Sequence, residues 1–173
     1  MLLIVDGLGD QAVDDQPVEK QSLAELVNLV EAARECAIPV VMAARKSGGS
    51  AGTLHAALGK LVRPSEVIKC DVANPWEDDD FSAVVRAAKR SRLLVTGRFT
   101  EICVTFAVLS ALEDGLDVYV VTDATYGASK EHHKTAISRM AQAGAVPVTT
   151  RQIVFEWQRG SLTKPEGPDA PGS

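Results

Sequence analysis

The chain has 173 residues, of which 46% are hydrophobic and 24% charged, and its formal net charge is −5. This is the composition of a globular protein with a core large enough to fold without cross-links. The acidic balance excludes the basic footprint of a nucleic-acid or membrane-surface binder, so we expect neither as a partner. Three widely spaced cysteines form no disulfide framework, and the opening apolar run is too short for a membrane span or a signal peptide. We therefore expect a cytoplasmic protein.

Short apolar runs alternate with segments of helical apolar spacing along the chain. The first run, "LLIV" at 2–5, predicts a buried strand that stops at Asp6. Further strands are expected at 38–44, 66–70, 92–97, 117–124 and 145–150, and helices at 23–36, 54–62, 81–88, 103–113, 133–143 and 152–159. This alternation predicts an α/β fold with three layers, α/β/α, and a mostly parallel central sheet. We expect one domain over residues 1–160 and a disordered Pro- and Gly-rich tail over residues 161–173.

Three polar residues fall at the carboxyl ends of the predicted strands, where sites form in such sheets. Asp6 follows the first strand, Lys69 ends a middle strand, and Cys103 follows the loop after "LLVTG". A cysteine attacks as the thiolate, and the helix start expected at Cys103 favours negative charge. Lys69 would add positive charge and Asp6 could accept the thiol proton. Each residue also has a plain structural reading: a core cysteine, a capping aspartate and a surface lysine.

The same segments resemble a known family. "LLIVDG" and "VTGRFTEICVTFAVLSALEDGLDVYVVTDA" resemble the first-strand and nucleophile segments of isochorismatase-like cysteine hydrolases, which include nicotinamidases and N-carbamoylsarcosine amidases. "NPWEDDDF", "SRMAQAGA" and "FEWQR" are most similar to the YcaC-like subgroup. The resemblance covers about residues 2 to 159 and implies an isochorismatase-like, Rossmann-like fold.

The resemblance implies a catalytic triad of Asp6, Lys69 and Cys103. It also implies a cis peptide at Arg98–Phe99, which would turn the Phe99 N–H toward the substrate. The oxyanion hole would then consist of the backbone N–H groups of Phe99 and Cys103. We expect Trp76, Phe99 and Thr100 to contact the substrate.

The chain departs from the metal-binding members of the family. Nicotinamidases hold a metal through an aspartate and histidines between the first strand and the lysine, where this chain has only His55. We therefore expect no catalytic metal and no cofactor. His132 and His133 are expected on the surface of a helix start. Family members are commonly oligomers, so a homo-oligomer is expected.

The reaction implied is hydrolysis of a small amide or related C–N substrate through a thioester on Cys103. Two alternatives stay open. The pocket could bind a small molecule without turnover, or Cys103 could be a redox sensor with Cys70 or Cys36 as the resolving thiol.

Overall fold

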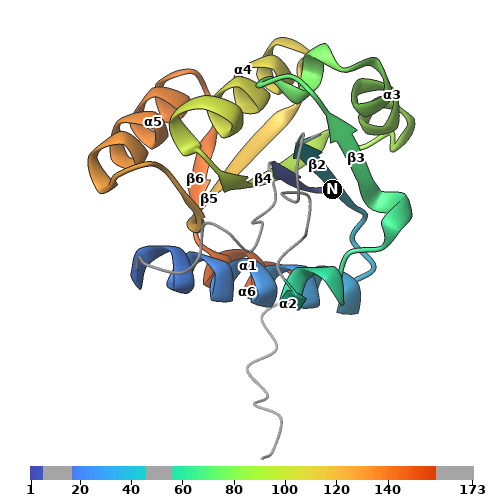
Figure 1. Ribbon diagram of the computed structural model, residues 1–173, viewed down its shortest axis with the longest axis horizontal. Helices are drawn as coiled ribbons and strands as arrows, with labels where there is room; N and C mark the ends of the chain where they lie inside the picture. Colours follow the sequence, from blue (N-terminus) through green and yellow to red (C-terminus); the bar gives the residue numbers. More distant parts are fainter. Residues whose placement is uncertain (6–16, 46–55, 159–173) are drawn as a thin grey trace, which may run out of the picture.

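A computed structural model describes residues 1–5, 17–45 and 56–158 of the chain (Figure 1). Within these ranges the strands are β1 Leu2–Val5, β2 Val40–Arg45, β3 Val67–Cys70, β4 Arg92–Arg98, β5 Asp117–Tyr126 and β6 Val146–Val148. The α-helices are α1 Pro17–Glu35, α2 Ala56–Gly59, α3 Asp79–Ala87, α4 Thr105–Glu113, α5 Lys130–Gln142 and α6 Thr150–Trp157. Short 3₁₀ turns lie at Pro64–Glu66 and Pro75–Glu77, and a π-helical turn, which we call the π-turn, spans Thr100–Val104.

The strands form one sheet in the order β3-β2-β1-β4-β5-β6, and every neighbouring pair is parallel. The order reverses direction between β1 and β4. The sheet borders are short, because β3 has four residues and β6 has three, one of them Pro147. The predicted α/β fold with a parallel sheet is confirmed, whereas the predicted tail at 161–173 lies outside the described residues.

Alternation along the strands divides the core between the two faces of the sheet. Leu2 and Ile4 belong to a cluster with buried residues of α1, α2 and α6, whereas Leu3 and Val5 belong to a second cluster with α3, α4 and α5. Figure 1 shows the helices in the same two groups, one layer on each side of the sheet. Strands buried on both faces explain why "LLIV" reads as a continuous apolar run.

Polar side chains fix where three helices begin. The carboxylate of Asp78 accepts the Phe81 N–H at 3.0 Å at the start of α3, and the Ser129 hydroxyl accepts the His132 N–H at 3.1 Å at the start of α5. Thr149 and Gln152 form a reciprocal capping box at the start of α6. Each cap satisfies N–H groups that the first helical turn leaves unbonded. None of the helices in the described ranges is long and apolar enough to cross a membrane.

Candidate functional site

The reversal of strand order between β1 and β4 marks the crevice in which open α/β sheets hold ligands, outside the carboxyl ends of the strands. Val5, the last residue of β1, pairs in register with Ala43 on one side and Gly97 on the other. These three strands therefore end at a common edge. Asp6 comes directly after β1 in the sequence, but its position lies outside the described residues.

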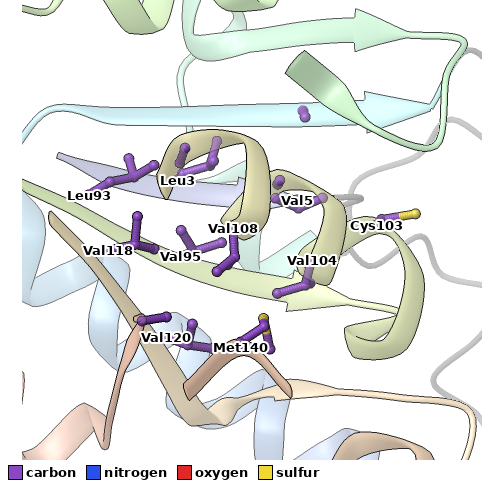
Figure 2. Close-up of a cluster of buried hydrophobic side chains, with 14 of the residues drawn as sticks. Leu3, Val5, Leu93, Val95, Cys103, Val104, Val108, Val118, Val120 and Met140 are labelled. Carbon is purple, nitrogen blue, oxygen red and sulfur yellow. The ribbon is translucent and has the colours of Figure 1, made fainter. Parts of the chain in front are cut away.

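Cys103 lies in the π-turn that follows β4, at this edge. Its side chain is 6% exposed and belongs to the cluster with α3, α4 and α5, against which Phe99 also packs. Figure 2 shows Cys103 at the opposite end of that cluster from Leu93, with its sulfur directed away from the other labelled side chains. The thiol thus lies where the core meets the carboxyl edge of the sheet.

The π-turn is wider than the α-helical turn expected to begin at Cys103. The Val104 N–H donates to the Phe99 carbonyl at 3.4 Å, five residues back, and the Thr105 N–H reaches the Thr100 carbonyl. The Thr105 hydroxyl also donates to that carbonyl at 2.5 Å. This side-chain bond supports a turn with one extra residue, a feature that is frequent at functional sites. Regular α-helix begins only at Thr105.

The predicted cis peptide at Arg98–Phe99 is wrong, because the described residues contain no cis peptide bond. Instead, Phe99 adopts a left-handed conformation, with φ 54° and ψ 63°, and this turns the chain from β4 into the π-turn. A left-handed residue reverses the chain at lower cost than a non-proline cis bond, which costs about 3–4 kcal/mol. The expected role of the Phe99 N–H in the oxyanion hole depended on the cis bond, so the structure gives that role no support.

Lys69 lies one residue before the end of β3, paired in register with Ala44, and its side chain is exposed. By the alternation of the strand it points to the opposite face from Cys70. Lys69 and Cys103 therefore share the carboxyl edge but approach it from different strands, with β2 and β1 between β3 and β4.

Two of the residues expected to contact the substrate have hydrogen-bond partners within the protein. Thr100 is 0% exposed and its hydroxyl lies 2.9 Å from Nδ1 of His133, so it is already engaged inside the protein. The Trp76 indole N–H donates to Asp114 at 3.1 Å, just past the far end of α4 from Cys103, and its ring packs edge-on against Phe81. Trp76 therefore anchors its own loop. Phe99, half-buried beside Cys103, stays a candidate for the pocket wall.

The prediction that His133 lies on the surface is wrong. His132 is exposed as expected, but His133 is half-buried and contacts the first residue of the π-turn. Burial lowers the pKa of His133, against the opposing effects of the Glu101 charge and of a hydrogen bond with the Thr122 backbone. The helical spacing distinguishes the two histidines, because His133 lies three and seven residues before Ala136 and Met140, which pack in the buried cluster, whereas His132 lies off that face. The contact with Thr100 itself depends on how α5 packs against the π-turn.

No group of three or more His, Cys, Asp or Glu side chains within 1–5, 17–45 and 56–158 could hold a metal ion. His55 lies outside the described residues.

Comparison with known proteins places the whole arrangement in one family. Residues 1–152 match the isochorismatase domain. The probable hydrolase YcaC of Escherichia coli is 38% identical over 107 residues, which make up 62% of this chain and 49% of YcaC. Isochorismatase family protein 1B of Dictyostelium discoideum is 36% identical over 72 residues, 42% of this chain and 35% of that protein. The chain thus spans about half the length of the first of these relatives and about a third of the second.

Two solved structures are similar over most of this chain. YcaC from Pseudomonas aeruginosa, with hexane-2,5-diol and covalent acrylamide, has a TM-score of 0.82 and 30% identity, covering 91% of this chain and 79% of that one. E. coli YcaC, described as an octameric hydrolase of unknown specificity, also has a TM-score of 0.82 and 30% identity, covering 91% and 78%. The chain therefore belongs to the isochorismatase family, as the segments around Asp6 and Cys103 predicted, and to its YcaC-like subgroup, as "NPWEDDDF", "SRMAQAGA" and "FEWQR" predicted together with the Cys103 segment.

Proposed function

We propose that the protein is a cysteine-dependent hydrolase of a small amide or related C–N substrate, with Asp6, Lys69 and Cys103 as its catalytic groups. The observation that carries this proposal is the position of Cys103 in the π-turn, beside the reversal of strand order. The relationship to YcaC, described as a hydrolase, supports the reaction class.

In the proposed reaction Asp6 accepts the proton of the Cys103 thiol, and the thiolate attacks the substrate carbonyl carbon. The oxyanion that forms accepts a hydrogen bond from the Cys103 N–H. Asp6 then protonates the departing nitrogen, which leaves as the amine, and a thioester remains. Water attacks the thioester, releasing the carboxylic acid and restoring the thiol. The positive charge of Lys69 keeps Asp6 ionised and stabilises the thiolate.

The surroundings of Cys103 explain why the charged partners are needed. A thiol among apolar side chains is inert unless a neighbouring positive charge or a base favours its thiolate. Cys103 packs in an apolar cluster, so its reactivity must come from groups at the edge of the sheet. Asp6 and Lys69 are the groups that the proposal assigns to this task.

The test is covalent capture followed by turnover. Acrylamide, which adds to thiolates through its β-carbon, is applied to the full chain, and the modified residue is identified by mass spectrometry. We expect modification of Cys103 in the wild type and in the control Cys36→Ser, slower modification in Asp6→Asn, and none at position 103 in Cys103→Ser. A panel of small amides should then give hydrolysis that Cys103→Ser lowers on the order of 10³-fold or more.

Two other results would contradict the proposal. A Cys103 that stays unmodified, in a protein that turns over no member of the panel, would favour a binding role. A Cys70–Cys103 disulfide formed under mild peroxide would favour a redox sensor, an outcome worth testing because both residues belong to the same buried cluster.

We also propose that the protein is a homo-oligomer that acts on a small molecule. E. coli YcaC is described as octameric. On this chain Ile102 of the π-turn and Phe106 of α4, four residues apart, are 44% and 37% exposed. Apolar side chains grouped on a surface are typical of subunit contacts. Light scattering after size-exclusion chromatography should give a multiple of the chain mass, and a monomer at micromolar concentration would contradict this proposal.

A further inference from the structure

The π-turn is attached to the start of α5 by its first two residues. Thr100 contacts Nδ1 of His133 through its hydroxyl at 2.9 Å, and Glu101 accepts the Ala128 N–H on Oε1 at 3.0 Å. The second carboxylate oxygen of Glu101 is buried against Gly127, where an added Cβ would come within 2.5 Å of it. Two consecutive residues of the π-turn are therefore fixed from outside, by a segment about 30 residues further along the chain.

The ring of His133 is held on two sides. Thr100 is its partner on the side of the π-turn, and a hydrogen bond with the Thr122 backbone of β5 acts to raise its pKa, against the larger lowering by burial. Burial keeps the imidazole neutral near pH 7, and a neutral ring has one N–H and one acceptor nitrogen. The bond between Thr100 and Nδ1 forms with the hydroxyl as donor in one tautomer of the ring and with Nδ1 as donor in the other. Glu101 is the charged group that acts on the ring from the π-turn.

A π-turn depends on such support, because its wide backbone ring is less favourable than an α-helical turn. Thr105 supports the turn from inside through the Thr100 carbonyl, and His133 supports it from outside through the Thr100 side chain. Both bonds meet at Thr100, three residues before Cys103. A shift of Thr100 would move the thiol relative to the edge of the sheet, and small displacements of a reacting group are costly for reactivity.

We propose that His133 is a positioning residue that, through Thr100, holds the π-turn in the conformation that presents the Cys103 thiol at the carboxyl edge of the sheet. This inference rests on the proposed nucleophilic role of Cys103. It assigns a function to a histidine that has no place in the triad and need not touch the substrate.

The test compares substitutions that keep or remove the polar atom facing Thr100. Asparagine places an amide atom where Nδ1 of histidine lies, whereas leucine fills a similar volume without a polar atom. The second-order rate of acrylamide addition to Cys103 is measured in the full chain, with Cys36 in the same molecule as the internal reference. We expect His133→Leu to lower the Cys103 rate about tenfold or more, and His133→Asn to keep it within about threefold of the wild type.

Three controls separate positioning from folding. His132→Leu changes the neighbouring exposed histidine and should leave the Cys103 rate unchanged. General loosening of the fold would raise the labelling of Cys36, whereas a displaced thiol lowers that of Cys103 alone. Thr100→Val removes the hydroxyl from the other side of the bond with little change in volume. It should reproduce the His133→Leu effect, and combining the two should add little further loss.

The outcomes are distinguishable. If wild-type Cys103 reacts and His133→Leu and Thr100→Val react equally fast, the positioning role is overturned while the proposed function stands. If His133→Leu does not fold, Thr100→Val and His133→Asn decide the question. If Cys103 of the wild type does not react at all, the proposed function and this inference both fail.

Discussion

Gly97 is a residue of β4 at which β1 leaves no room for a side chain. It has a φ of +143°, and a Cβ at this position would lie 2.0 Å from the carbonyl oxygen of Val5. A side chain would therefore meet backbone rather than a flexible neighbour. The close approach holds Val5, the last residue of β1, against the strand that leads to Cys103.

We expect Gly97→Ala to lower the free energy of unfolding by about 3 kcal/mol or more, because backbone strain of order 1–3 kcal/mol adds to the clash. The matched control is Gly115→Ala, which also has a positive φ, +78°, but no atom within 4 Å of an added Cβ. That change should cost only the strain, about 1–2 kcal/mol. Urea denaturation followed by circular dichroism measures the free energy of unfolding of both variants. Equal decreases would show that the contact with Val5 does not destabilise Gly97→Ala.

At the scale of elements, a single arginine joins the end of α1 to the entry of β3. Arg34, in the last turn of α1, donates to both carboxylate oxygens of Glu66, at 2.8 Å and 2.5 Å, and to the Leu61 carbonyl at 3.0 Å and 2.7 Å. Both side chains are mostly buried, with exposed fractions of 23% and 15%. Burial acts to raise the pKa of Glu66, but the hydrogen bonds and charges of Arg34 and Arg63 outweigh it and lower the pKa below 4.5.

A double-mutant cycle with Arg34→Met and Glu66→Gln should give a coupling energy of about 1–2 kcal/mol at pH 7, because the pair is bidentate and shielded from water. Since the folded-state pKa of Glu66 is depressed, its contribution is complete above pH 4.5 and is lost as the pH falls through the folded-state value. The stability difference between the wild type and Glu66→Gln should therefore shrink in acid. A difference independent of pH between 7 and 3 would contradict this account.

At the scale of the whole molecule, the two core clusters share one sheet. Alternate residues of β1 pack in opposite clusters. Detachment of either layer of helices would therefore expose apolar side chains of the strands to water. The two tryptophans of the chain report on the layers separately, because Trp76 packs against the cluster with α3, α4 and α5, and Trp157 against the other.

We expect both layers to unfold in one transition. Trp76→Phe leaves Trp157 as the single fluorescent tryptophan, and Trp157→Phe leaves Trp76. In each variant the urea transition seen by fluorescence should coincide with that seen by far-UV circular dichroism, as two-state unfolding requires. A midpoint for Trp157 well below the circular dichroism midpoint would instead show that α1 and α6 detach before the sheet unfolds.

The sequence predicted the fold well because the signals for it are local. Each strand is an apolar run of a few residues, and each helix has an apolar spacing that requires no knowledge of its neighbours. Cys103 could be singled out as a candidate nucleophile because it lies in a long motif at the end of a predicted strand. The π-turn was not predicted because its extra residue is stabilised by the Thr105 hydroxyl. That contact does not change the spacing of apolar residues along the sequence. The contact between His133 and Thr100 spans 33 residues and exists only once α5 has packed.

The short border strands of the sheet disfavour one way in which copies of this chain could associate, the addition of a strand. A long exposed border strand can recruit a strand from another molecule and start fibre-like aggregation. Here β3 offers four residues and β6 three, and Pro147 has no N–H with which to extend the ladder. Strand addition therefore has little to build on at either border of the described sheet.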